Sequence, residues 1–421
     1  MALRTHKDMR KGSGRGPTAS PRRSHREWFQ RSALAVGFAV LGYMGVTSSL
    51  AHVVAKGDPA SAHAMAPGNG IILAEYAQDT FTRGLKSESN SLAANLSRRA
   101  LLAEPTAADA LTVLGFQAQL RGDTEETDRI FSYSTALSRR ELRPRVWAIE
   151  EAVGRGDIVG AIRNYDIALR TSKDAGDIFY PTLTKALSEP RIRSALLAIL
   201  ATDPVWKNGF IAYAADSGSE PSGTIALFRE GRQIGLTPSN DLRANLVNVL
   251  MARNERDEAW TYYRTFRSGV RRDRSRDPKF ALEATVRAVF DWQVGTDTRL
   301  SAAILREGDG GLLDFSAPPS TGGTLVSQLQ LLPAGTYRIE GRSRGVEQPE
   351  RSRPYWTLVC QDGRQLGRVM LPNSNQDGGR FVGRFTVPSG CEVQTLSLVA
   401  RSTDDLMGVS GQILNAQLVP G

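Results

Sequence analysis

The chain has 421 residues, a formal net charge of +9 at pH 7 and a mean hydropathy of −0.29, and its length allows two or three domains with separate cores. Residues 1–32 carry nine lysines and arginines against one aspartate and one glutamate, a net +7, which leaves +2 (9 − 7) for the other 389 residues. A body so close to neutral excludes the basic surface expected of a nucleic-acid-binding protein. We therefore interpret residues 1–32 as a basic, disordered tail and expect no nucleic-acid partner.

An uncharged segment of 23 residues, 33–55, follows the tail. As a helix it spans about 34 Å, enough to cross the hydrocarbon core of a bilayer. Because the basic residues precede it, the positive-inside rule predicts a single transmembrane helix with residues 1–32 in the cytoplasm and the remainder outside. Two alternatives stay open, a signal peptide cleaved near Val53–Ala55 and a buried core helix.

The tripeptide Arg-Gly-Asp occurs at 121–123 and again at 155–157, which is 34 residues later (155 − 121). At the same shift Phe131 falls on Tyr165, and the residues after Ile158 are apolar at helical spacing. These features predict helix pairs that repeat every 34 residues. In the turn between two helices, the glycine ends the first helix and the aspartate caps the second, so we interpret the tripeptide as a turn and not as an adhesion motif.

This unit resembles the tetratricopeptide repeat, whose helix pairs stack into a curved solenoid. We place five or six units between about 66 and 280, and we expect Pro181, Pro190 and Pro221 to interrupt the helices of 172–240. The residues that match the family pattern are small (Ala93, Ala161, Ala259, then Ala100 and Ala168), aromatic (Phe131, Tyr165, Tyr263) or the proline before the next unit (Pro105, Pro204, Pro238).

The resemblance implies a peptide or protein partner on the inner face of the first helices. A scaffold face without a specific ligand is the alternative, because the matching positions mix both charges with apolar residues. These candidate partner-binding residues are Thr112, Phe116, Gln119, Arg143, Val146 and Glu150.

The run Arg271–Asp277 interleaves arginines with aspartates and is predicted to be a solvated, self-paired linker. From about 285 the pattern has period two, with Phe290 and Trp292 on one face and Asp291 on the other. Short runs of this kind between Gly- and Pro-containing turns predict an antiparallel β-sandwich of seven to nine strands over 285–421. The fold class is therefore α then β: one transmembrane helix, an α-solenoid over 66–280 and a jelly-roll-like sandwich.

Cys360 and Cys391 are the only cysteines. Outside the cytoplasm we expect them to form one disulfide, worth about 3.5 kcal/mol in the chain-entropy model, with two separate buried thiols as the alternative. The sandwich resembles jelly-roll modules that bind carbohydrate, which follow a repeat domain in some bacterial envelope proteins of polysaccharide production. Such modules stack sugars on exposed aromatic rings. Tyr355 is the candidate glycan-binding residue, and Trp356, on the opposite face of its strand, is assigned to the core.

All four histidines precede residue 64, which excludes a histidine-based triad or His-ligated zinc from the rest of the chain. The chain contains no phosphate-binding loop motif. Carboxylate pairs such as Glu307 with Asp309 or Glu150 with Glu151 are interpreted as ordinary surface residues. We therefore expect no enzyme, no catalytic residue, no cofactor and no metal site.

These features lead to a hypothesis of a bacterial inner-membrane protein with a periplasmic body. The repeats would act as a scaffold for protein partners in the assembly or export of a surface polysaccharide. A glycan-binding protein that acts through the sandwich is the second hypothesis. A polysaccharide-cleaving enzyme that uses carboxylates alone is the third.

Overall fold

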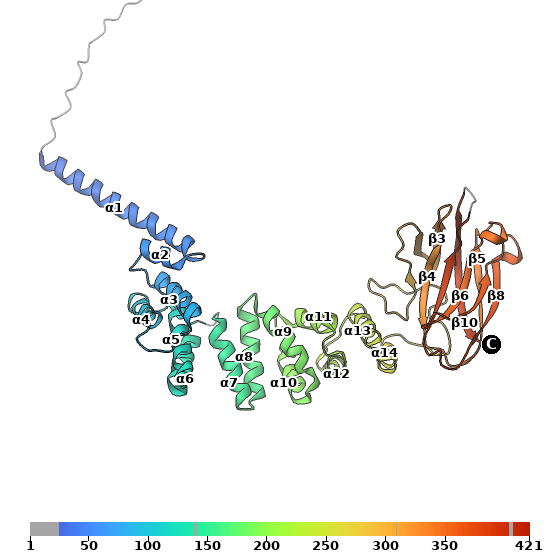
Figure 1. Ribbon diagram of the computed structural model, residues 1–421, viewed down its shortest axis with the longest axis horizontal. Coiled ribbons are helices and arrows are strands. Elements are labelled where there is room, and N and C mark those ends of the chain that lie inside the picture. The colour runs from blue at the N-terminus through green and yellow to red at the C-terminus, as the bar shows by residue number, and fades with distance from the viewer. Residues whose placement is uncertain (1–24, 139–140, 309, 404–406) are drawn as a thin grey trace, which may run out of the picture. The chain divides into compact units, whose positions relative to one another are not determined.

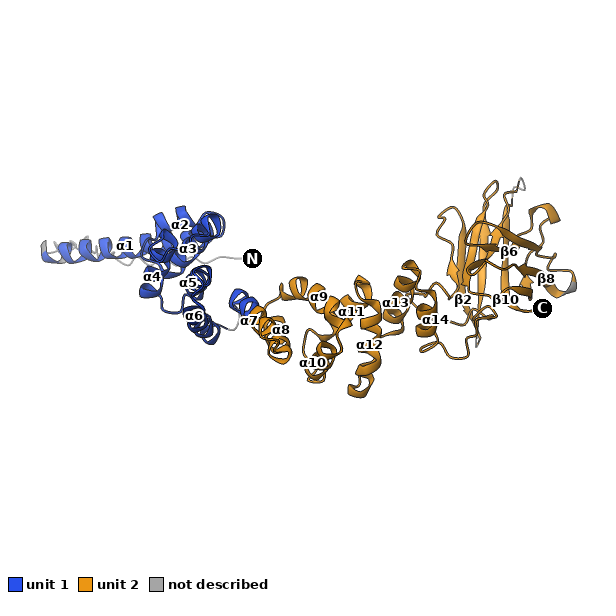
Figure 2. Ribbon diagram, turned by 60° about the horizontal axis from the view of Figure 1, so that its bottom comes forward, with its two compact units in different colours: residues 1–147 blue, residues 148–421 orange. Residues whose placement is uncertain are grey.

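A computed structural model describes residues 25–138, 141–308, 310–403 and 407–421 of the chain (Figure 1). Most of the predicted basic tail, residues 1–24, lies outside the described residues, as does Asp309. The chain divides into two compact units, residues 1–147 and 148–421 (Figure 2). The predicted fold class is confirmed, because helices occupy the N-terminal part and two antiparallel sheets the C-terminal part. The boundaries at 66–280 and 285–421 stay predictions.

Helix α1 (His25–Ala55) contains the predicted uncharged segment and starts eight residues before it (33 − 25), so residues 25–32 are helical and not disordered. Its stretch 28–55 is long and apolar enough to cross a membrane, with a mean hydropathy of 1.6, although a signal sequence meets the same criteria. The C-terminal end of α1 is packed. Ala51 and Ala55 are buried in a cluster with Ala62 of α2 (Pro59–Met65) and Ile72 of α3 (Gly70–Gly84).

Helix pairs follow at the spacing that the repeated tripeptide predicts. In the first unit α3 is followed by α4 (Leu92–Ala103), α5 (Ala108–Leu120) and α6 (Thr124–Leu137), and α7 (Leu142–Gly154) crosses the boundary of the units. In the second unit the helices are α8 (Ile158–Thr171), α9 (Ala175–Lys185), α10 (Pro190–Leu200), α11 (Lys207–Ser217), α12 (Pro221–Gly231), α13 (Asn240–Ala252) and α14 (Arg256–Tyr263). Short 3₁₀ turns, η1 (Ala186–Ser188) and η2 (Arg232–Ile234), follow α9 and α12.

Both Arg-Gly-Asp tripeptides are turns between helices, as predicted. Gly122 and Gly156 have φ values of 77° and 72°, the left-handed region that favours glycine. The side chain of Asp123 accepts a hydrogen bond from the backbone N of Glu126 at 3.0 Å, and Asp157 caps α8 in the same way. The tripeptide is therefore held in a structural turn on both occasions.

The prediction that three prolines interrupt the helices is wrong. Pro190 and Pro221 occupy the first positions of α10 and α12, where a backbone N–H has no partner inside the helix. Pro181 lies inside α9, which nevertheless continues to Lys185. Two of the three prolines thus start helices of the repeat array.

The C-terminal part is a sandwich of two five-stranded antiparallel sheets, with strand orders β1-β4-β9-β6-β7 and β2-β3-β10-β5-β8. The described residues hold ten strands where seven to nine were predicted, because the two-residue β1 counts as one. The strands are β1 (Gln293–Val294), β2 (Ser301–Glu307), β3 (Gly310–Ala317), β4 (Gly323–Gln330), β5 (Gly335–Arg344), β6 (Tyr355–Cys360), β7 (Gln365–Met370), β8 (Arg380–Val387), β9 (Gln394–Ala400) and β10 (Val409–Pro420).

The sandwich core contains Trp292, Phe315, Trp356 and Phe385, none of them more than 1% exposed. The predicted disulfide between Cys360 and Cys391 is present. It ties the end of β6 to the segment before β9, so the two cysteines are covalently paired and not separate thiols.

The segment 264–292 between α14 and the sandwich is packed and only in part a solvated linker. Arg271 and Asp273 pair with each other at its surface, as predicted. Arg276, however, is 4% exposed, and its guanidinium donates to the carbonyl of Phe290 at 3.1 Å and to the side-chain oxygen of Gln330 at 2.7 Å. A third bond goes to the carbonyl of Leu329. We call these contacts the junction.

Asp291, which alternates with Phe290 and Trp292 in the sequence, is also buried, at 2% exposed. Its carboxylate accepts hydrogen bonds from the hydroxyl of Tyr263 at 2.7 Å and from the guanidinium of Arg267 at 3.2 Å. Around these charges, Trp260 of α14 and Leu331 of the sandwich belong to one apolar cluster. The last repeat helix and the sandwich therefore share a core within the second unit.

Replacing Arg276 by Met should lower the melting temperature of the second unit by about 6 °C or more, because three buried acceptors lose their donor at a cost of about 1–3 kcal/mol each. The measurement is thermal unfolding of the full-length chain in detergent, followed by tryptophan fluorescence. Arg271→Ala, in the same run but at the surface, should cost no more than about 0.5 kcal/mol. Equal effects of the two substitutions would contradict the structural role of the junction.

Candidate functional site

The predicted partner-binding residues on the first helices differ in how accessible they are. Thr112 in α5 is 1% exposed, and its hydroxyl donates to the carbonyl of Ala108 at 3.1 Å. Phe116 is half-buried, 5.2 Å from the ring of Phe131, while Gln119 is exposed. Thr112 thus has its hydroxyl engaged inside the helix, whereas the partner-binding role of this group stays a prediction.

The predicted residues of α7 are more open. Arg143 and Glu150 are exposed and Val146 is half-buried. The guanidinium of Arg143 lies 3.7 Å from the carboxylate of Asp109. Burial, and then the charge of Glu150, raise the pKa of Tyr165 in the second unit. These side chains offer charges of both signs, and their assignment to a partner stays a prediction.

Tyr355, the predicted glycan-binding residue, is half-buried on the outer face of its sheet, while Trp356 is in the core. The guanidinium of Arg368 lies 4.9 Å from the centre of the Tyr355 ring, so a cation already covers one side of that ring. Of the eight aromatic residues in 285–421, the other seven are buried. The described part of the sandwich therefore has no fully exposed aromatic ring on which a sugar could stack.

Charge is the feature that distinguishes one sheet of the sandwich. In β5 the buried Tyr337 and Ile339 alternate with exposed arginines on the outer face. The neighbouring β8 repeats this pattern, with buried Phe381 and Phe385. We define the basic sheet face as four exposed arginines of these strands, Arg338, Arg342, Arg380 and Arg384.

The register of β5 and β8 places these arginines directly opposite one another, Arg338 facing Arg384 and Arg342 facing Arg380. Like charges opposite each other on antiparallel strands are destabilising. Arg338 has an ion pair with Glu340 at 3.2 Å, but the other three have no ion pair with a described residue. Three of these four positive charges therefore have no carboxylate of the described residues in an ion pair with them.

A groove of about 460 Å³ lies beside one of these pairs. Gly341 is one of its lining residues, and a Cβ atom there would lie only 2.2 Å from the carbonyl oxygen of Asn415, so a side chain would not fit without a shift of the backbone. The groove has donors and acceptors along its sides. It is lined by Pro278, Lys279, Glu340, Gly341, Arg342, Arg380, Asn415 and Gln417.

Sequence reasoning missed this face, although a signal was present. Residues 337–344 read YRIEGRSR, in which charged residues recur at every second position. That alternation predicts a strand with one charged face, but the opposition of arginines depends on pairing with β8, which is about 40 residues away in the chain. In the described residues no group of three or more His, Cys, Asp or Glu side chains could hold a metal ion.

No protein-family model matches the chain, and no curated protein matches it. Solved structures similar to parts of it include the enzymatically active domain of tailspike protein 4 of bacteriophage CBA120, at 12% identity and a TM-score of 0.24 over 32% of this chain and 20% of that one. The chain thus covers a fifth of the tailspike domain.

Two further solved structures are also similar to part of the chain. The CBM22-1 xylan-binding domain of Xyn10C from Paenibacillus barcinonensis is 10% identical over 31% of this chain and 85% of that one, with a TM-score of 0.23. The pilF protein of Pseudomonas aeruginosa is 15% identical over 47% of this chain and 91% of that one, with a TM-score of 0.24. TM-scores this low carry no inference about what the chain does.

Replacing Arg384 by Glu should stabilise the sandwich by about 0.5 kcal/mol, because a like-charge pair with Arg338 becomes an attractive one. The gain should shrink as added salt screens the charges. Thermal melting at low and high ionic strength measures both effects. Arg401→Glu, at an exposed position outside the sheet, is the matched control and should show no gain. A loss of stability at Arg384 would contradict the repulsion inferred from the register.

Proposed function

We propose that the chain is a membrane-anchored scaffold of the bacterial cell envelope. In this proposal α1 crosses the inner membrane, the periplasmic repeats hold protein partners, and the assembly serves the production or export of a surface polysaccharide. One observation carries it: the apolar helix α1 ends inside the core of the first helices, with Ala51 and Ala55 buried against α2 and α3. The proposal assigns no catalytic step to the chain.

The packing of α1 favours a retained anchor over a cleaved signal peptide. Cleavage near Val53–Ala55 would remove Ala51 from the cluster and expose Ile72, which is 0% exposed in the intact structure. In contrast, large apolar residues of α1 such as Phe38 and Leu41 are 71% and 66% exposed. Such a helix has one apolar part that needs a lipid environment and one end that belongs to the folded body.

The anchor can be tested by the mass and location of the mature protein. Expressed in a Gram-negative host, the chain should stay in the inner membrane and keep its full mass of 45.8 kDa. A tag at the N-terminus should resist protease added to spheroplasts, while the body is digested. Recovery of a soluble periplasmic product that lacks the first 55 residues would overturn the proposal.

Matched substitutions in the same helix refine this test. Ala51→Leu should cost about 1–3 kcal/mol, because it overpacks the cluster formed with α2 and α3. Ala39→Leu, at an exposed position of α1, should leave stability unchanged. Both are read by thermal melting in detergent. If Ala51→Leu is also neutral, the end of α1 is not part of the folded body.

A second candidate function, glycan binding by the sandwich, is favoured by the basic sheet face. Guanidinium groups recognise carboxylates and phosphates through paired hydrogen bonds. Arg342, Arg380 and Arg384 have no ion pair with a described residue, and the first two line an open groove on the sheet. The ligand that fits this face is an acidic polysaccharide, held by charge and not by stacking on an aromatic ring.

Reversing the charge of one opposed pair, Arg342→Glu with Arg380→Glu, should weaken binding to an acidic polysaccharide such as polygalacturonate by at least about tenfold. Affinity electrophoresis measures the change, and added salt should weaken binding of the unmodified chain. Neutral dextran should not bind, and Arg401→Glu should behave like the unmodified chain. Greater loss from Tyr355→Ala than from the charge reversal would instead favour stacking on that ring.

A further inference from the structure

A pocket of about 200 Å³ lies between α12, α13 and α14. Ile225 and Phe228 form an apolar part of its wall. Six of its nine lining residues come from α12 and α14, the second helices of their pairs, so it is distinct from the predicted partner-binding surface on the first helices. The lining residues are Ile225, Phe228, Arg229, Arg232, Arg243, Glu258, Thr261, Tyr262 and Thr265.

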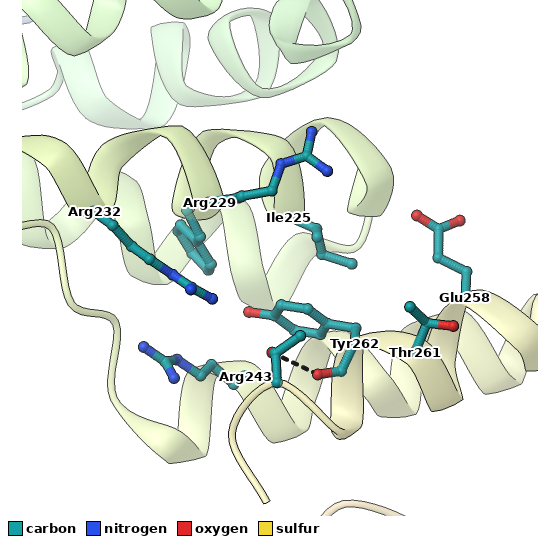
Figure 3. Close-up of a pocket in the computed structure, with 9 residues that line it drawn as sticks. Ile225, Arg229, Arg232, Arg243, Glu258, Thr261 and Tyr262 are labelled. Atoms are coloured by element: carbon teal, nitrogen blue, oxygen red, sulfur yellow. Dashed lines mark hydrogen bonds between the residues drawn. The ribbon is translucent and has the colours of Figure 1, made fainter.

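Tyr262 is the residue that fold stability does not explain. It is only 7% exposed, yet its hydroxyl has no hydrogen-bond partner among the described residues. A buried hydroxyl without a partner costs about 1–3 kcal/mol, so a phenylalanine would serve the packing better. In Figure 3 the hydroxyl points into the pocket, away from the body of its own helix. The Tyr262 hydroxyl is thus placed to donate a hydrogen bond to a ligand in the pocket.

Arginines line the pocket near this hydroxyl. Figure 3 shows the guanidinium of Arg232 directed toward the hydroxyl end of Tyr262, and the side chain of Arg243 lies below it with its guanidinium extending to one side. Their charges partly offset the effect of burial, which raises the pKa of the Tyr262 hydroxyl well above its ordinary value. Neither these two nor Arg229 has an ion pair with a described residue. The one acidic lining residue, Glu258, accepts a hydrogen bond from Ser222 at 3.0 Å.

We propose that this pocket binds an anionic group, a carboxylate or a phosphate, carried on a compact apolar stem. The anion would accept hydrogen bonds from the Tyr262 hydroxyl and from the guanidinium groups of Arg232 and Arg243. The stem would lie against Ile225 and Phe228. This site is independent of the proposed anchor and of the basic sheet face, since it uses none of their residues.

The test uses the full-length chain in detergent and calorimetric titration with small probes. Benzoate and phenyl phosphate carry the two anions on an aromatic stem, and benzamide is a neutral molecule of nearly the same shape. We expect the anions to bind and benzamide to bind at least about tenfold more weakly. The tighter of the two anions identifies the preferred group. Binding should weaken with added salt.

Variants separate binding from folding. Tyr262→Phe should leave the melting temperature of the free protein unchanged or raise it, yet weaken anion binding by about tenfold. Arg232→Gln and Arg243→Gln should each weaken it by a similar factor. Arg264→Gln, two residues after Tyr262 and outside the pocket, should leave the dissociation constant within about twofold.

Two results would overturn the proposal. One is the absence of binding for both anions at concentrations up to roughly 10 mM, the weak limit of a specific site. The other is equal binding of benzamide and benzoate, which would make the pocket apolar in character. Because Tyr262→Phe is expected to fold as well as the unmodified chain, a loss of binding in that variant cannot be attributed to unfolding.

Discussion

The second unit depends on one buried charge, the guanidinium of Arg276. Burial lowers the pKa of Arg276 to about 10, against the opposing effects of Tyr263 and Asp291, so the group stays charged at neutral pH. A buried charge is tolerated only where hydrogen bonds satisfy it. Here the backbone carbonyls of Phe290 and Leu329 and the side chain of Gln330 supply the acceptors. The chain between helices and sheets can therefore follow only a path that brings these acceptors together.

This constraint explains why the last repeat and the sandwich share a core. Trp260 and Phe290 both pack near the Arg276 guanidinium, each with its ring centre 5.7 Å away, and the two ring centres lie 5.4 Å apart. The backbone of Ser275 pairs with Leu418 near the chain end, so the segment also joins the sheet of β10. Apolar side chains pack around the Arg276 guanidinium. The last helix of the repeat array therefore packs against the sandwich and does not end in an uncovered helix face. The end of a solenoid is otherwise an exposed apolar face, which terminal repeats must cover.

Local features of this fold could be predicted from the sequence, and long-range ones could not. The turn at Gly156–Asp157 is specified by its own residues. The disulfide is predictable because Cys360 has only one other cysteine in the chain with which to pair. The buried positions of Asp291 and Arg276 depend on residues 24 to 54 positions away, such as Arg267 and Gln330. In sequence both look like ordinary surface charges, because period and composition say nothing about which partners the fold will bring to them.

Two sets of arginines in this chain thus have different physical roles. Arg276 is buried with its guanidinium hydrogen-bonded to neutral oxygens, and the fold requires it. Arg380 and Arg384 face other arginines across two strands, and Arg232 and Arg243 line a pocket whose Tyr262 hydroxyl has no hydrogen-bond partner among the described residues. A sequence shaped by stability alone would favour a glutamate, a threonine or a phenylalanine at such places, because each arrangement raises the free energy of the folded state. The anionic ligands proposed above would explain why charges that the fold does not need stand where they oppose it.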